Sequence, residues 1–223
     1  MVFVHLISNA SDDKSLDTVF NIVAGIEMGF FDIFKGKTRR KEVREAYEDA
    51  PADFPKFKYH QNPFLWDFKT DDAPCPCCGK VTGYIHEHTA IHEEEIENIC
   101  PWCIADGSAA EKFGCVFNDV SDIDGIPPER IDELTRRTPG LSTWQDLDWP
   151  THCNDFYSFV DYVIWPKIKQ MGIEKEIEQD LSENDSDFSV KEIKKGLHAT
   201  SSMRGYLFRC LHCGKYHLHV DLD

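Results

Sequence analysis

The sequence predicts an α+β fold in which short antiparallel strands and several helices pack around cysteine-bearing turns. Three features of the sequence lead to this prediction. Cys-x-x-Cys pairs recur three times, alternating apolar residues flank two of the pairs, and apolar residues with helical spacing lie between them. With 223 residues, of which 41% are hydrophobic, the chain is long enough to bury a core of its own.

The first residues are expected to form a helical extension, residues 1–53, ahead of a main domain that spans residues 54–223. Helical spacing links four apolar residues of the extension: Leu16, Val19, Phe20 and Val23. Met28 begins a segment that resembles a bacterial protein start, so an alternative places residues 1–27 upstream of the true initiator. Aromatic and then basic residues over 30–41 predict a short helix docked on the main domain, or alternatively a helix on a membrane surface.

The charge of the chain constrains its partners. The formal net charge is -16 and the pI is about 5.0. Such a surface repels phosphate backbones, whose contacts with Lys and Arg supply most non-specific affinity for nucleic acid. A basic protein is instead attracted. The sequence therefore predicts a protein partner and makes nucleic acid the less favoured one.

Cysteine usage and the apolar runs indicate the compartment. Six of the nine cysteines lie in Cys-x-x-Cys pairs, which favours metal binding in a reducing compartment over a disulfide framework. The chain begins without a basic leader, since its first lysine is Lys14, after two aspartates. No apolar run reaches the roughly 18 residues that span a bilayer. These features predict a cytoplasmic location without a membrane span.

Two of the pairs, Cys75–Cys78 and Cys100–Cys103, each carry a proline after the first cysteine and have the form of zinc knuckles. Two such turns aim four thiolates at one tetrahedral Zn²⁺, at about 2.3 Å from each sulfur. Residues 79–99 separate the pairs, slightly more than in the usual zinc ribbon. We therefore expect zinc-ribbon-like knuckles with Cys75, Cys78, Cys100 and Cys103 as ligands. Redox-active or free thiols are the alternative.

The third pair, Cys210–Cys213, needs two further ligands to complete a second zinc site. Cys153 is the best candidate, and His152 is next. A neighbouring His and Cys both reach one ion only where the chain turns sharply. Four other residues rank behind them: Cys77, Cys115, His217 and His219. The pairing stays open, because Cys210–Cys213 also suits a ribbon with Cys75–Cys78, and one or two zinc ions are expected.

Strands and turns are predicted around the first two pairs. Residues 57–60 alternate like a strand, and residues 81–85 form a second strand. Three histidines follow in an acidic segment: His86, His88 and His92. We expect a solvated loop there, and a further metal site is the alternative. Ser108 and Glu111 have capping-box spacing at the start of a helix.

Helices are predicted over most of the C-terminal half. Residues 127–128 are prolines that open one helix, which residues 138–140 end. Four apolar residues with helical spacing predict a second helix: Phe156, Phe159, Val160 and Val163. Another is predicted by the spacing of Ile173, Ile177 and Leu181. The chain then closes with two strands, over 205–209 and 216–222, on either side of the third pair.

An enzymatic alternative requires a zinc ion with an open coordination position, where bound water supplies the nucleophile. Asp106, His152 or Asp155 would then act as acid or base, and Trp144 and Trp149 would line the pocket. Asp106 is more simply a turn residue. The zinc deaminase pattern is excluded, because the span before the second cysteine pair is too short and lacks the required proline.

Longer motifs give the chain a resemblance to a known family. They are Phe57-Lys58-Tyr59-His60, Cys75-Pro76-Cys77-Cys78, the run from Cys100 to Phe113, Arg137-Thr138-Pro139-Gly140, Trp144, His152-Cys153 with Asp155-Phe156, and the run from Tyr206 to Lys215. Over residues 54–223 the chain resembles the CbrC family of bacterial proteins. The resemblance implies tolerance of a DNA-cleaving colicin, and no enzymatic activity is established for that family. It favours Cys153 as a metal ligand over Cys115 and the loop histidines.

The expected function is therefore protein binding by a zinc-stabilised cytoplasmic protein. A basic nuclease toxin is the expected kind of partner, with colicin or bacteriocin tolerance or immunity as the context. A hydrolase-like zinc enzyme and a nucleic-acid-binding zinc ribbon are the alternatives. Four thiolate ligands on each zinc would favour the first interpretation, whereas a zinc with few ligands in a cleft beside Trp144 and Trp149 would favour the enzyme.

Overall fold

The structure is a computed structural model. The structure describes residues 50–222 except 89, 122–123, 144, 146 and 185–187. Nearly all of the N-terminal extension and Trp144 lie outside the described residues. The predictions of the early helix, of the initiator at Met28 and of a domain boundary at residue 53 therefore remain predictions.

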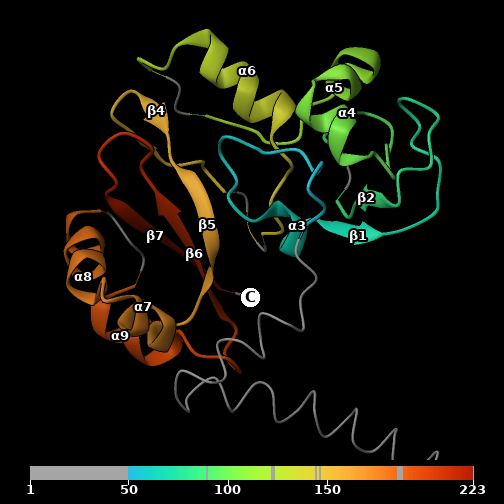
Figure 1. The fold of residues 1–223 in the computed structure, drawn as a ribbon. Coiled ribbons are helices and arrows are strands. Elements are labelled where there is room, and N and C mark those ends of the chain that lie inside the picture. Colours follow the sequence, from blue (N-terminus) through green and yellow to red (C-terminus); the bar gives the residue numbers. More distant parts are fainter. Residues whose placement is uncertain are drawn as a thin grey trace, which may run out of the picture. The chain divides into compact units, whose positions relative to one another are not determined.

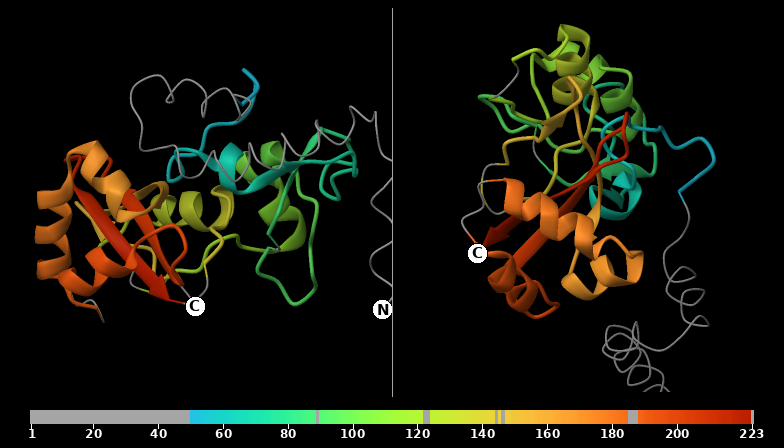
Figure 2. Two further views of the ribbon diagram at one scale, coloured as in Figure 1. Left: turned by 90° about the horizontal axis from the view of Figure 1, so that it is seen from below. Right: turned by 90° about the vertical axis from the view of Figure 1, so that its left-hand side faces the viewer.

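A three-stranded antiparallel sheet organises the C-terminal half of the described chain. Its strands are β5 (Ser158–Val163), β6 (Met203–Arg209) and β7 (Tyr216–Leu222), in the order β5-β6-β7. Three helices cover one face of the sheet: α7 (Trp165–Met171), α8 (Glu174–Glu183) and α9 (Val190–Gly196) (Figures 1 and 2). Side chains alternate along β6, so Leu207 packs under these helices while its neighbours face the other way.

The opposite face of the sheet packs against a second core. Tyr206 and Phe208 of β6 meet Phe159 of β5 in this core. Leu134 of helix α6 (Pro128–Arg137) is fully buried there. The small hairpin of β3 (Thr151–His152) and β4 (Asp155–Phe156) closes its edge. This core holds one metal-ligand candidate, Cys210.

The remaining elements form a cysteine-rich N-terminal part of the main domain. They are α3 (Pro63–Trp66), β1 (Phe68–Thr70), β2 (Tyr84–His86), α4 (Pro101–Ala105) and α5 (Ser108–Phe113). Strands β1 and β2 pair antiparallel. The core here is built around Cys75, Cys100 and Cys103, with the aromatic rings of Phe57, Phe68 and Phe117 beside them.

The predicted α+β class is confirmed. Seven helices and short antiparallel sheets make up the described residues. The two closing strands and the helices over 128–137 and 174–183 lie where the sequence places them. Among the described residues, no helix is long and apolar enough to cross a membrane.

The predicted helix over residues 156–163 is wrong, because these residues form β4 and β5. The pairing of β5 with β6 shifts between Phe159 and Asp161, so Val160 is an extra residue in the ladder. A β-bulge of this kind breaks the strict alternation of a strand. The apolar residues of this segment then lie three and four positions apart, which is the spacing typical of a helix.

Three smaller predictions are also wrong. Residues 57–60 form only isolated bridges, of which one joins His60 to Phe159. A helix does begin at Ser108, as predicted, but it lacks the predicted side-chain cap; a capping box joins Ser189 to Glu192 at the start of α9 instead. His86 is buried, so the histidine segment is not wholly a solvated loop.

The backbone of Phe117 lies so close to Gly140 that we expect only glycine to fit at this position without a backbone shift. A Cβ atom there would lie 2.6 Å from the Phe117 carbonyl oxygen. We expect Gly140→Ala to lower the free energy of unfolding by about 1–3 kcal/mol, because the backbone must move. Urea unfolding measures the change. Gly196→Ala is the control, since the nearest contacts of its Cβ are with the flexible end of Met203; equal losses in both variants would contradict the prediction.

Candidate metal centres

The structure brings the predicted ligands together in two groups. The first cluster consists of Cys75, Cys78, Cys100 and Cys103, and the second cluster consists of His152, Cys153, Cys210 and Cys213. Within each group, the candidate ligand atoms lie within 4.8 Å of one another. This grouping separates Cys210–Cys213 from Cys75–Cys78.

Two of the cysteine pairs lie on the same kind of turn. In each turn the glycine after the second cysteine adopts a positive φ, 73° at Gly79 and 78° at Gly214. The Gly79 N–H donates to the Cys75 carbonyl, and the Gly214 N–H donates to the Cys210 carbonyl. Glycine adopts this left-handed conformation without strain, so the sequence itself builds the knuckle. The pair Cys100–Cys103 lies differently, across the N-terminal end of α4.

The first cluster has the spacing of a tetrahedral thiolate site. Zinc–sulfur bonds of about 2.3 Å place the four sulfurs of such a site roughly 3.8 Å apart. The Sγ atoms of Cys78 and Cys100 are 4.0 Å apart. In addition, the Cys100 backbone N–H donates to Cys75 Sγ at 3.3 Å, which favours the thiolate form. Three of the four cysteines are buried, and Cys78 is exposed.

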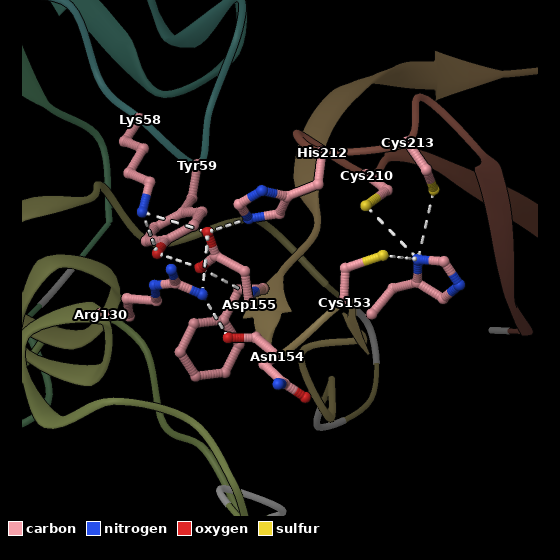
Figure 3. Close-up of polar contacts among 11 residues, drawn as sticks. Lys58, Tyr59, Arg130, Cys153, Asn154, Asp155, Cys210, His212 and Cys213 are labelled. Carbon is pink, nitrogen blue, oxygen red and sulfur yellow. Dashed lines mark hydrogen bonds and ion pairs between the residues drawn. The ribbon is translucent and has the colours of Figure 1, made fainter.

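The second cluster centres on Nδ1 of His152. This nitrogen lies 3.2 Å from Cys153 Sγ and 3.4 Å from the sulfurs of both Cys210 and Cys213. Figure 3 shows the three thiols pointing toward one imidazole nitrogen. One imidazole and three thiolates around zinc have nitrogen–sulfur separations of roughly 3.6 Å. The residues present therefore fit a zinc ion in both clusters.

A sharp turn allows the neighbouring His152 and Cys153 to share one centre. His152 and Asp155 are paired across the β3–β4 hairpin, and Cys153 and Asn154 form its two-residue loop. Both loop residues have a φ of 55°. Two successive positive φ values are the signature of a type I′ turn, which asparagine tolerates well. The hairpin thus directs both side chains to the same point.

Backbone donors favour one thiolate in each cluster. Burial raises the pKa of Cys210, but N–H groups of Cys213 and His212 donate to its sulfur and lower that pKa to about 6. Burial also raises the pKa of Cys75, and backbone donors including Cys100 bring it below its ordinary value. In contrast, burial raises the pKa of Cys100 to about 11. Cys75 and Cys210 are therefore the thiols most ready to bind a cation.

The lower-ranked ligand candidates lie outside both clusters. Cys77 Sγ lies 3.5 Å from the Ser108 hydroxyl, and Cys115 is buried beside the Ala109 carbonyl. Nδ1 of His217 is 3.0 Å from Asp180, which joins β7 to α8. Like His217, His219 is not in either group.

A family match accompanies this geometry. A model of the Uncharacterised protein family (UPF0167) matches residues 54–222. The chain belongs to the UPF0167 family. UPF0167 protein PA1536 of Pseudomonas aeruginosa is 32% identical over 179 residues, which cover 76% of this chain and 96% of that protein. UPF0167 protein Mb2317 of Mycobacterium bovis is 30% identical over 178 residues, 77% of this chain and 95% of that protein. No solved structure matches the chain significantly.

Next to the second cluster, this UPF0167 chain has a polar site that the sequence did not reveal. Its centre is the carboxylate of Asp155, which is 1% exposed. Tyr59 donates a hydrogen bond to Asp155 Oδ1 at 2.5 Å, and His212 Nε2 lies 2.9 Å from Oδ2. Lys58 and Arg130 approach Oδ2 at 3.3 and 3.7 Å. We call these five residues the Asp155 cluster (Figure 3).

Electrostatics in the Asp155 cluster favour the ionised carboxylate. Burial raises the pKa of Asp155, but hydrogen bonds from Tyr59 and His212 and the charge of Lys58 bring it below its ordinary value. Burial and the hydrogen bond to Asp155 raise the pKa of Tyr59 well above its usual range. Tyr59 thus stays protonated and acts as a fixed donor.

A second buried polar set of this chain lies beside β1 and β2. Asp67 and His60 are fully buried, with His60 Nε2 2.6 Å from Asp67 Oδ2. His88 Nε2 lies 3.5 Å from the other oxygen, and the His86 ring is 5.2 Å from the His88 ring. Burial raises the pKa of Asp67, but the imidazoles, His60 foremost, lower it below its ordinary value. His92 is exposed and lies outside this set. The predicted solvated loop is therefore confirmed at His92 but not at the buried His86.

The two carboxylates that were considered as catalytic acids or bases, Asp106 and Asp155, accept hydrogen bonds within the protein. Asp106 Oδ1 accepts a hydrogen bond from the Ser108 N–H at 2.9 Å, as a turn residue does. Asp155 accepts the donors described above. Trp149 is a core residue whose indole N–H donates to the Tyr157 carbonyl at 2.8 Å.

Proposed function

We propose that this chain is a zinc-binding protein whose two metal centres are structural and that it acts by binding another protein. The observation that carries the proposal is the number of ligands. Each cluster offers four protein ligands at tetrahedral spacing. Structural zinc sites are closed by four protein ligands, whereas catalytic zinc keeps one position for water.

The ligand sets also indicate which metal is preferred. Thiolates are soft ligands that select zinc over magnesium, calcium or manganese. When bound, zinc supplies a cross-link between chain segments. Through the second cluster, Cys153 in the β3–β4 hairpin is joined to Cys210 and Cys213, which lie between β6 and β7.

An exposed acidic segment supports a basic protein as the partner. Glu93, Glu94, Glu95 and Glu97 are all exposed. Within the described part of the chain, no lysine or arginine forms an ion pair with them. With a net charge of -16, the chain steers basic proteins toward such a segment and repels nucleic acid.

The resemblance to the CbrC family suggests what the partner does. We propose that a basic nuclease toxin is bound and that tolerance of it is the biological context. Acidic surfaces suit this task because electrostatic complementarity raises the association rate with basic partners. The enzyme alternative is disfavoured by the four-ligand sets, and the nucleic-acid alternative by the charge.

Elemental analysis tests the metal proposal. We expect two zinc ions per chain in protein purified without chelator, because each cluster is complete. A value of one would refute the two-site form, and a value near zero with the fold retained would refute structural zinc. The second cluster is tested by His152→Ala, which we expect to lower the zinc content toward one.

A binding assay tests the partner proposal separately. We expect the tagged protein to retain a nuclease colicin at low salt and to protect cells that are exposed to it. Replacement of Glu93, Glu94, Glu95 and Glu97 by Gln should weaken retention, mainly by slowing association. The control removes the same charge at four other exposed acids, Asp53, Asp72, Glu111 and Asp124. Equal weakening by both sets, or no retention by the unaltered protein, would contradict the proposal.

A further inference from the structure

The Asp155 cluster contains more positive charge than its buried carboxylate needs. Oδ1 of Asp155 accepts hydrogen bonds from the Tyr59 hydroxyl and the Phe156 backbone N–H, at 2.5 and 2.9 Å. His212 contacts Oδ2 at 2.9 Å. Both oxygens are therefore satisfied without Lys58 and Arg130, which lie further away at 3.3 and 3.7 Å. Two permanent cations flank one carboxylate, which leaves a net charge of +1.

Both cations remain in contact with solvent. The side chains of Lys58 and Arg130 are 40% and 28% exposed, whereas Asp155 is 1% exposed. The carboxylate thus forms the floor of the cluster and the cations form its rim. Figure 3 shows Lys58 and Arg130 converging on Asp155 from different segments of the chain.

Donors on both cations are uncommitted. Arg130 uses one terminal nitrogen, NH1, for the Asn154 carbonyl and for Asp155. Its Nε and its second terminal nitrogen have no hydrogen-bond partner within the described part of the chain. Lys58 Nζ donates to the Tyr59 hydroxyl at 2.7 Å and faces Asp155, and its third donor has no partner among the described residues. A guanidinium with two adjacent free N–H groups matches an oxyanion in a bidentate arrangement.

The local field strengthens this preference. Arg130 lies in the first turn of α6, a helix of ten residues, where the positive end of the helix dipole adds to its charge. A cation at this position is unfavourable for the helix alone. Further along α6, Asp132 is paired with Arg136 and Glu133 with Arg137. The adjacent Glu129 forms no ion pair with Arg130 among the residues that the structure describes. Arg130 therefore keeps its charge available at the rim.

We propose that Lys58 and Arg130, held in place by Asp155, form a binding site for a small oxyanion such as a phosphoryl or carboxylate group. Tyr59, protonated and fully buried, fixes the carboxylate from below. The site lies beside the second cluster but uses none of its ligands. Because the chain as a whole is strongly acidic, its overall field weakens the binding of anions at this site.

Calorimetry and thermal unfolding of the full zinc-loaded chain test this site. The probes are inorganic phosphate and acetate, compared with chloride at equal ionic strength because salt alone screens charges. We expect saturable binding of phosphate, acetate or both, and the stronger of the two identifies the group. Binding of neither probe beyond the effect of chloride would overturn the proposal.

Matched variants locate the site. We expect Arg130→Gln and Lys58→Gln each to weaken binding by about tenfold, the loss of one charge-assisted contact. Arg136→Gln on the same helix and Lys56→Gln on the same segment are the controls, and both side chains are exposed or nearly so. Equal weakening by the controls would overturn the proposal.

A conservative variant separates binding from folding. Arg130→Lys keeps the charge but lacks the planar fork, so it should unfold at the same temperature and bind several-fold more weakly than the natural chain. Unchanged affinity in this variant together with unchanged affinity in Lys58→Gln would also overturn the proposal. Neither result depends on the toxin assay, so the oxyanion site and the proposed protein partner can fail independently.

Discussion

Cys103→Ser is expected to release one of two zinc ions and to unfold the N-terminal part of the main domain. Cys103 is buried in the first cluster and in the hydrophobic core that surrounds it. Structural zinc contributes about 10–16 kcal/mol in small zinc domains, whereas a whole domain is stable by only about 5–15 kcal/mol. The core cannot compensate for that loss. Zinc content and urea unfolding, measured on the same preparation, report the two effects.

Cys115→Ser provides the matched control for this prediction. Cys115 is equally buried in the same core but belongs to neither cluster. We expect two zinc ions to remain and the free energy of unfolding to fall by about 1–3 kcal/mol, the cost of burying a hydroxyl group. If Cys103→Ser kept both zinc ions, or if the two variants were equally unstable, the first cluster would not be a structural zinc site.

Acidification is expected to destabilise the protein through His86. Burial, and then the neighbouring His88, lower the pKa of His86 from 6.5 to about 4. In the unfolded chain the imidazole takes up a proton near its ordinary pKa, so the unfolded state binds more protons between these two values. Stability from the neutral His86 is therefore complete above pH 6.5 and is lost as the pH falls toward 4, by about 3 kcal/mol. The lowered pKa of Asp67 extends the loss to still lower pH.

Urea unfolding between pH 7.5 and pH 5 measures this dependence. His86→Phe should flatten the slope, because the new ring has no proton to bind and faces Phe68 and Phe117. His219, whose pKa burial also lowers, leaves a residual slope. His92→Gln, at an exposed position, should leave the slope unchanged. A slope that His86→Phe does not alter would show that other groups, such as the metal ligands, carry the acid sensitivity.

Local chemistry made much of the metal-ligand geometry predictable. Cysteine spacing and the following glycine define each knuckle within a few residues, so no long-range information was needed for Cys75–Cys78 or Cys210–Cys213. The closing strands were also predictable, since β7 alternates apolar with polar residues and β6 is a short, largely apolar run on the other side of the knuckle. The role of His152 as a ligand was less predictable, because it depends on positive φ values at Cys153 and Asn154 that no residue type guarantees.

Other features depended on tertiary structure. A single extra residue, Val160, gave β5 the periodicity of a helix. The burial of His86 follows from its contacts with Phe68 and Phe117, which come from other segments of the chain. Likewise, nothing in the sequence indicates that Lys58 and Arg130 lie beside Asp155, which the sequence offered only as a possible acid or base. Charges that meet from separate segments leave no periodic signal in the chain.

The β3–β4 hairpin contributes residues to both the second cluster and the Asp155 cluster. Its two-residue loop carries Cys153 toward the second cluster, and Asp155 follows after a single residue, Asn154. The Asn154 carbonyl also accepts a hydrogen bond from Arg130. A ligand at either end therefore restrains the same few backbone torsions. If zinc in the second cluster changes the affinity of the proposed oxyanion site, thermodynamic reciprocity requires the oxyanion to change the affinity for zinc by the same factor.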